Sequence, residues 1–175
     1  MRVVMIAAQS LDGFITRHGE PGSAFTSAED KAHFRAAVAG FDACVFGGET
    51  YRVSRGFIRD RFPGRPLRVV VTRDPARFAA DAIPGGLEFT AARPLDIADS
   101  LRTRGCRQCA LLGGGQIHSL FLEAGLVDEV WLTVEPVLFG GGTPLVARPA
   151  SISLELQASE KLGASTLLLK YRVRH

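Results

Sequence analysis

The chain has few cysteines and no long apolar run. None of its apolar stretches reaches the roughly 18 residues that a membrane-spanning helix needs, so we expect no membrane partner. Its three cysteines, Cys44, Cys106 and Cys109, are too few and odd in number for a disulfide framework. Cys106 and Cys109 form a C-x-x-C pair, but no second pair of ligands follows at comparable spacing. The sequence therefore predicts no metal site.

Lysine is also scarce, since it is found only at Lys31, Lys161 and Lys170, and the formal net charge is only +3. So small an excess, without a stripe of basic and aromatic side chains, predicts no nucleic-acid partner. Arginines nevertheless crowd one segment: Arg52, Arg55, Arg59, Arg61, Arg65, Arg68 and Arg73. This segment is either a solvated loop or a rim that attracts a phosphorylated ligand, and the sequence leaves both interpretations open.

The composition fits one globular protein. Hydrophobic residues make up 46% and charged residues 22% of the chain, which is ordinary for such a protein. We expect a single domain over residues 1–175, large enough to bury roughly two-thirds of its unfolded surface. The apolar run from Arg2 to Ala8 is too short for a signal peptide and lacks a cleavage-like end. We therefore expect a first strand there and a cytoplasmic protein.

Apolar runs and helix signals alternate along the chain. The runs predict strands at Arg2–Ala8, Asp42–Phe46, Leu67–Thr72, Leu87–Thr90, Cys109–Leu112 and Val127–Val134. Helices are predicted to Ala39, over Pro94–Arg104 and over Gly115–Ala124, with a short one after Gly48. The stretches Ile152–Leu156 and Thr166–Val173 predict a C-terminal hairpin. The order predicts an α/β three-layer sandwich, with a central, mostly parallel sheet and an antiparallel C-terminal hairpin.

Two capping signals overlap at the start of the first helix. Thr26 with Glu29, or Ser27 with Asp30, fits the pattern of a hydroxyl and an acidic residue three positions later. Asp30 therefore has a structural explanation as half of a capping box.

Twice, a predicted strand breaks into glycines that open a helix, at Gly47–Gly48 and at Gly113–Gly115. Glycine permits a tight turn and lets a ligand approach the main chain. The first turn of the following helix offers unpaired N–H groups and a partial positive charge, which suits phosphate. The two junctions together predict a phosphate cradle for a nucleotide-type ligand. A second triple glycine, Gly140–Gly142, ends this part of the chain.

Several stretches together resemble the dihydrofolate-reductase-like superfamily. They are S-L-D-G-F-I at 10–15, T-S-A-E-D-x-x-H-F at 26–34, D-A-x-V-F-G-G-E-T-Y at 42–51 and the region from the first to the second triple glycine. More narrowly, the chain resembles stand-alone relatives of the reductase domain of the bifunctional riboflavin-biosynthesis deaminase/reductase. The resemblance covers nearly the whole chain.

This resemblance implies an NADPH-dependent oxidoreductase, a homodimer, that reduces a small heterocycle of pterin or pyrimidine type. It implies catalytic roles for Asp12, on a loop that closes over the nicotinamide, and for Asp30, which would hold the heterocycle. It implies cofactor contacts at Ala8, Gly47, Gly48, Glu49, Thr50, Thr72, Arg73, Gly113, Gly114, Gly115, Gln116 and Ile117. Among these, Arg73 would meet the adenosine 2′-phosphate.

The chain departs from the family pattern at two positions. Gly48 stands where many relatives carry an arginine that contacts cofactor phosphate, and Leu112 stands where riboflavin-pathway reductases usually carry a glutamate. The missing basic residue at Gly48, together with the capping explanation for Asp30, motivates an alternative function: a nucleotide-binding protein of the same fold without efficient catalysis. Leu112 bears instead on the substrate, because the fold and the cofactor carry over better than a ribityl-type substrate does.

Overall fold

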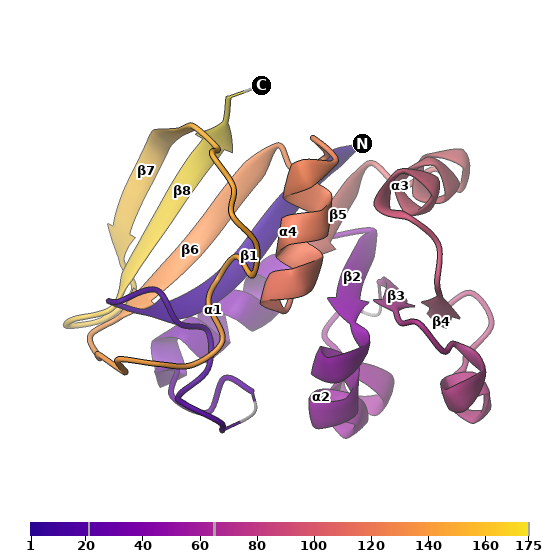
Figure 1. Cartoon of the computed structure of the whole chain (residues 1–175), viewed down its shortest axis with the longest axis horizontal. Coiled ribbons are helices and arrows are strands. Elements are labelled where there is room, and N and C mark those ends of the chain that lie inside the picture. Colours follow the sequence, from indigo (N-terminus) through magenta and orange to yellow (C-terminus); the bar gives the residue numbers. More distant parts are fainter. Residues whose placement is uncertain (21, 65, 175) are drawn as a thin grey trace.

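A computed structural model describes residues 1–20, 22–64 and 66–174. Its centre is an eight-stranded sheet in the order β4-β3-β2-β5-β1-β6-β8-β7 (Figure 1). The strands are β1 (Arg2–Ser10), β2 (Ala43–Gly47), β3 (Leu67–Val71), β4 (Leu87–Thr90), β5 (Gln108–Leu111), β6 (Glu129–Glu135), β7 (Leu154–Lys161) and β8 (Leu167–Val173). The pairs from β4 to β6 are parallel, and β8 and β7 are antiparallel additions. The predicted mostly parallel sheet and C-terminal hairpin are confirmed.

Four α-helices of the described residues lie in two layers. They are α1 (Ala28–Val38), α2 (Gly48–Asp60), α3 (Pro94–Thr103) and α4 (Gly115–Glu123), and a 3₁₀ helix spans Ala76–Asp81. Helices α3 and α4 pack on one face of the sheet, with Ile97, Leu101 and Phe121 in that core. Helices α1 and α2 pack on the other, with Val38 and Ile58 in the second core. The predicted three-layer sandwich is therefore confirmed.

Strand β1 shows why the central strands read as continuous apolar runs. Val3 and Met5 point into the core under α3 and α4, whereas Val4 and Ile6 point into the core under α1 and α2. Successive side chains of a strand face opposite sides, so a strand covered on both faces needs apolar residues at every position. This places β1 at the centre and its carboxyl end between the two helical layers.

The arginine-rich segment is mainly regular structure, so its interpretation as a loop is wrong. Helix α2 runs on to Asp60 through a kink at Ser54 and carries Arg52, Arg55 and Arg59. Arg68 lies in β3, where its buried guanidinium donates to the carbonyl oxygens of Ile58, Arg59 and Gly86. Arg65 lies outside the described residues. The sequence predicted only a short helix after Gly48, because the buried side of α2 rests on Tyr51 and Ile58 alone among the described residues.

Within the described residues, none of the helices combines the length and the apolar character that crossing a bilayer requires.

Candidate functional site

The two glycine junctions lie side by side at the carboxyl edge of the sheet. Strands β2 and β5 are parallel neighbours, and the Gly47 N–H donates to the Gly113 carbonyl oxygen at 2.7 Å. Helices α2 and α4 start from this edge (Figure 1), with Gly47 and Gly114 as N-caps that make no side-chain capping bond. Two helix N-termini therefore share one edge, and each leaves first-turn N–H groups for a ligand.

Two of the three glycines in the first cluster are needed for packing. A Cβ at Gly113, where φ is +89°, would lie 2.8 Å from His118 Nε2. A Cβ at Gly115 would lie 2.4 Å from the carbonyl oxygen of Pro144. These glycines let helix α4 and the crossing segment 144–147 approach the strand end, so their absent side chains make no room for a ligand.

Gly114 is the glycine that faces the cradle. A Cβ there would have only ordinary contacts, at 3.8 Å from Ile15 Cδ1 and from Thr50 Oγ1. It therefore points between the loop after β1 and the first turn of α2. This geometry brings together two predicted cofactor residues, Gly114 and Thr50, with Ile15 of the loop that is predicted to close over the nicotinamide.

At the Gly47–Gly48 junction, where the basic residue of many relatives is missing, there is little space for a side chain. A Cβ at Gly48 would lie 3.1 Å from Thr72 Cβ, and one at Gly47 would lie 2.9 Å from Ile117 Cγ1. A side chain at position 48 would require Thr72 to shift by a few tenths of an ångström. The Thr72 hydroxyl in turn accepts the Asp74 N–H at 3.3 Å, which shapes the turn after β3.

The charged side chains near the two glycine junctions differ in whether they already have an ion partner. Arg52 forms two bonds with Glu49, from Nε at 2.9 Å and from Nη2 at 2.6 Å, and this bonding lowers the pKa of the Glu49 carboxyl. Arg73 is exposed at the end of β3 and makes no ion pair with any described residue. Arg73 is therefore available to an anionic ligand at the end of β3.

Three other predicted cofactor residues differ in how far their side chains are exposed. Ala8 is half-buried in β1, opposite Thr133 of β6. Gln116 is exposed in the first turn of α4. Ile117 is buried in the core, and its N–H donates to the Gly114 carbonyl oxygen at 2.9 Å. Ala8 and Gln116 are thus better placed to touch a ligand than Ile117, and all three contacts stay predictions.

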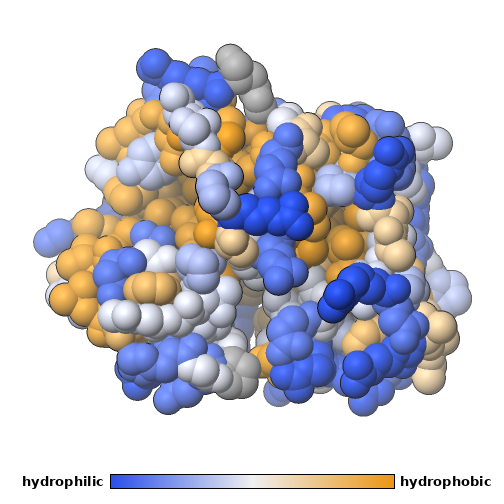
Figure 2. All heavy atoms as spheres, in the orientation of Figure 1, coloured by the Kyte–Doolittle hydropathy of each residue, from blue (hydrophilic) through white to orange (hydrophobic). Residues whose placement is uncertain are grey.

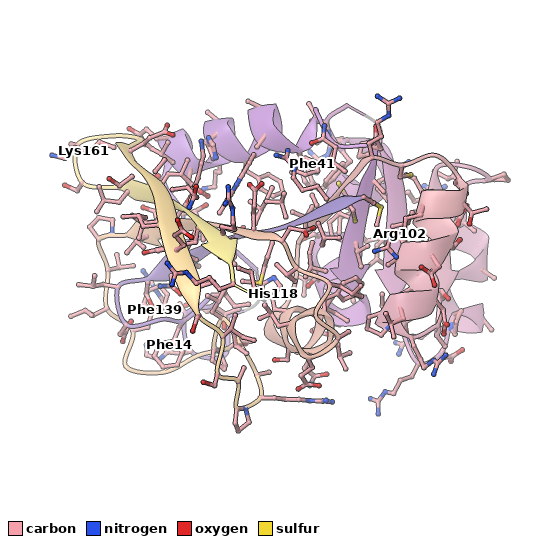
Figure 3. The ribbon with its side chains drawn as sticks, turned by 90° about the horizontal axis from the view of Figure 1, so that it is seen from above. Phe14, Phe41, Arg102, His118, Phe139 and Lys161 are labelled. Carbon is pink, nitrogen blue, oxygen red and sulfur yellow. The ribbon has the colours of Figure 1, made fainter. Side chains whose placement is uncertain are left out.

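Asp12 ties two loops together. Its carboxylate accepts the Ser10 hydroxyl at 2.6 Å and the N–H groups of Phe139 at 3.1 Å and Gly140 at 2.7 Å. These hydrogen bonds lower the pKa of Asp12, and the bond from Ser10 has a larger effect than the bond from Gly140. Its loop is also joined to residues 141–144 by main-chain bonds, and Figure 3 labels Phe14 and Phe139 from these two segments. The carboxylate is already committed to these partners, and its catalytic role stays a prediction.

The Asp30 carboxyl does not make the hydrogen bond to the N-cap that a capping box predicts. Ser27 is the N-cap and accepts the Asp30 N–H at 3.1 Å, so Ser27 rather than Thr26 caps the helix. The Ser27 N–H, however, donates to Glu135 at 2.7 Å. The interpretation of the Asp30 carboxyl as half of a capping box is therefore wrong, because Glu135 holds the group that Asp30 would hold. The sequence reading missed Glu135, whose signal is a charged residue within an apolar strand, just before Pro136.

The Asp30 carboxyl is buried, and burial is the largest cause that raises its pKa above the ordinary value. Hydrogen bonds from Thr133 and Thr26 act in the opposite direction, and the nearby Glu135 raises the pKa further. A carboxyl in this setting holds a proton at higher pH than a solvated one and can donate it.

A polar cavity of about 390 Å³ lies between helices α1 and α2. Its lining is Ser23, Lys31, Phe34, Arg35, Val53, Ser54, Gly56, Phe57 and Arg61. Lys31 Nζ donates to the Thr26 carbonyl oxygen at 2.9 Å, whereas Arg35 and Arg61 are exposed and form no ion pair with a described residue. Three cations around one polar cavity suit an anionic ligand.

A second hollow of about 260 Å³ is mainly apolar and lies between α4, the sheet and segment 145–154. Figure 2 shows apolar surface over the side of the molecule that carries the C-terminal strands. The polar side chains in the lining of this hollow are Arg148 and Tyr171, and the other lining residues are apolar.

Known proteins share this fold and, in part, this sequence. A riboflavin biosynthesis protein RibD from Corynebacterium ammoniagenes is 27% identical over 94% of the chain, and the chain spans about half the length of that relative. The structure of a pyrimidine reductase-like protein from Corynebacterium diphtheriae has a TM-score of 0.79 at 19% identity, over 99% of this chain and 92% of that one. A deaminase/reductase from Thermotoga maritima has a TM-score of 0.80 at 20% identity, over 99% of this chain and 56% of that one.

These structural likenesses show a shared fold of the dihydrofolate-reductase-like type, as the sequence predicted. The family described as the RibD C-terminal domain matches residues 2–168, which is nearly the whole chain. The chain belongs to the RibD C-terminal domain family.

Proposed function

We propose that this chain is an NADPH-dependent oxidoreductase that reduces a small phosphorylated heterocycle, most simply of pyrimidine type. The observation that carries the proposal is the contact between the two glycine junctions, Gly47 N–H to Gly113 carbonyl at 2.7 Å, which joins two uncapped helix N-termini at one edge of the sheet. The cationic cavity between α1 and α2 supports the second half of the proposal.

The residues present fit a dinucleotide phosphate. First-turn N–H groups of α2 and α4 would bind the pyrophosphate, with Gly114 giving the closest approach to the main chain. Arg73, exposed and without an ion partner among the described residues, would pair with the 2′-phosphate. When bound, NADPH supplies the hydride.

The substrate class follows from the cavity and from a relative. The Thermotoga maritima structure is named as a 5-amino-6-(5-phosphoribosylamino)uracil reductase, so a phosphorylated aminopyrimidine is the first candidate here. Lys31, Arg35 and Arg61 would attract the phosphate. Asp30 lies one helical turn from Phe34 of the cavity lining and would hydrogen-bond the heterocycle and hold the proton that balances hydride addition.

For Asp12 we propose a role as loop anchor. Its hydrogen bonds with Ser10, Phe139 and Gly140 hold the loop 11–16 against the second glycine cluster. The loop would then exclude water from the reacting rings.

The test is a titration followed by turnover. NADPH and NADH are titrated by fluorescence, and loss of NADPH absorbance is then followed with the phosphorylated aminopyrimidine, its dephosphorylated form, dihydropterins and dihydrofolate. We expect NADPH binding and fastest oxidation with the phosphorylated pyrimidine. Failure to bind either dinucleotide would overturn the proposal.

The alternative is a nucleotide-binding protein of the same fold without efficient catalysis. Leu112 at the position of the family glutamate and the Glu49 carboxylate in the first turn of α2 favour it. Tight NADPH binding without oxidation across the whole panel would support this alternative.

We also propose that the protein is a cytoplasmic homodimer. Its three cysteines are all free thiols, which suits a reducing compartment. Exposed leucines on the C-terminal hairpin, Leu154, Leu156 and Leu167, support a partner surface at that end of the sheet.

A further inference from the structure

Glu135 is an unusual residue for its place in the fold. It ends the central strand β6 and is only 2% exposed, yet it carries a carboxylate. Burying such a group is costly unless hydrogen bonds compensate. Its three donors are the Ser27 N–H at 2.7 Å, the Ser27 hydroxyl at 2.9 Å and the Thr166 hydroxyl at 2.9 Å. The carboxylate thus joins the first turn of α1 to strand β6 and to the chain just before β8.

The bond to the Ser27 N–H decides what Asp30 can do. In a capping box, the acidic residue at the third helical position bonds the N–H of the N-cap. Ser27 and Asp30 have the spacing for it, and the Asp30 N–H does bond the Ser27 hydroxyl at 3.1 Å. Because Glu135 takes the Ser27 N–H from the sheet side, the Asp30 carboxyl is released from capping.

We propose that Glu135 is a positioning residue for Asp30: it takes over the capping bond to Ser27, fixes the first turn of α1 on the sheet, and so leaves the Asp30 carboxyl available to the substrate. This inference rests on the proposed function for its last step, the contact of Asp30 with substrate. The capping exchange itself depends only on the contacts of Ser27.

The charge of Glu135 also affects Asp30, because it disfavours ionisation of the Asp30 carboxyl. Two carboxyl groups that face each other disfavour ionisation of one of them. After burial, which is the main cause, Glu135 is the group that raises the pKa of Asp30, and Thr133 and Thr26 oppose the rise. Removal of the Glu135 charge should lower the pKa of Asp30.

The other charged groups around Asp30 come from three elements. His33, one turn along α1, favours the ionised carboxylate of Asp30. His33 in turn faces Lys170 of β8, which lowers the pKa of His33 after burial, and Glu160 of β7, which raises it. Lys170 and Glu160 are bonded to each other at 2.9 Å. A change at Glu135 leaves these groups in place, so their contribution is common to the native protein and the variant.

The experiment titrates Asp30 directly. Protein labelled with carbon-13 at aspartate carboxyl groups is followed by NMR against pH, and Asp30→Asn assigns the signal. We expect Glu135→Gln to lower the pKa of Asp30, because the charge of Glu135 raises it. Glu129→Gln, the same change near the other end of β6, is the matched control and should cause no shift. An unchanged Asp30 titration in Glu135→Gln would overturn the proposal.

A second measurement does not depend on the folding of Glu135→Gln. In Asp30→Ala, the exchange protection of the Ser27 amide should be unchanged, because Glu135 holds that N–H. A fall of tenfold or more in protection would show that Asp30 caps the helix and would overturn the proposal. Neither readout needs substrate: if both results hold and no substrate is reduced, the proposed function fails while the capping exchange stands.

Discussion

At the scale of single residues, His118 shows how a polar group can be fixed inside the core. It is 1% exposed on α4, labelled in Figure 3, and its Nδ1 lies 2.9 Å from the Leu145 carbonyl oxygen. Because a carbonyl only accepts, Nδ1 carries the proton. Nε2 has no partner among the described residues and lies under Gly113. Burial lowers the pKa of His118 to about 4.

We therefore expect acid to destabilise the protein through His118. In the unfolded chain the imidazole titrates near 6.5, and in the folded chain at about 4. Between these values the unfolded state binds more protons, so the free energy of unfolding falls as the pH is lowered, by up to about 3 kcal/mol. Urea unfolding at about pH 7, 6, 5 and 4 should show this loss in the native chain and a smaller loss in His118→Asn. Equal pH dependence in both proteins would contradict the assignment.

A second residue-scale prediction concerns the cofactor. Arg73→Ala should weaken NADPH binding about tenfold or more and NADH binding little, because only NADPH has the 2′-phosphate that Arg73 would pair with. Arg52→Ala is the matched control, since Arg52 is already bonded to Glu49. Fluorescence titration with both dinucleotides measures the difference. An equal loss of both cofactors in Arg73→Ala would show that the 2′-phosphate assignment is wrong.

At the scale of elements, the site is made where strands end and helices begin. Helix α4 starts close to β5 because Gly115 leaves room for the carbonyl oxygen of Pro144. The crossing segment is then held by bonds from the N–H groups of Ala147 and Arg148 to the Ser119 hydroxyl, at 2.9 and 3.2 Å. The start of α4 and this segment therefore depend on each other.

Two glycine substitutions separate packing from helix propensity. Gly115→Ala should lower the free energy of unfolding by about 1–3 kcal/mol, because its Cβ would overlap the Pro144 carbonyl. Gly56→Ala, inside α2 with nothing within 4 Å of its Cβ, should instead raise it by about 0.5–1 kcal/mol. Urea unfolding measures both changes. A Gly115→Ala variant as stable as the native chain would mean that segment 144–147 is not packed on α4.

At the scale of the whole molecule, one sheet carries both cores. It runs without a break from β4 to β7, and α1, α2, α3 and α4 cover its parallel part. The C-terminal hairpin is the least covered part of the sheet, and it carries three of the six exposed leucines among the described residues. A single sheet shared by all layers argues for one cooperative unit, and an uncovered edge argues for association.

Unfolding should therefore be a single transition that depends on protein concentration. Fluorescence of Trp131, in the central strand β6, and far-ultraviolet circular dichroism should report the same midpoint in urea. That midpoint should rise with protein concentration if two copies associate, and sedimentation should give twice the monomer mass. Separate midpoints would contradict the single domain, and a monomer mass would contradict the dimer.

The sequence by itself determined the fold and the position of the cradle. Continuous apolar runs such as Arg2–Ala8 specify strands covered on both faces, and glycines after such runs specify strand-to-helix turns, because both signals are local. Helix α2 was predicted too short and its arginines were placed in a loop, since its burial comes from contacts with distant strands. Local propensity carries no information on such contacts.

Only the tertiary structure decided which side chains are free to act. Asp30 and Ser27 have the spacing of a capping box, and nothing nearby in sequence shows that Glu135, 108 residues away from Ser27, takes the bond. In the same way, Arg52 is occupied by Glu49 while Arg73 is exposed and without an ion partner in the described chain. A hydrogen bond goes to the partner that folding brings nearest, so the availability of a charged group is settled by the packing of elements, whereas its identity and rough place are settled by the sequence.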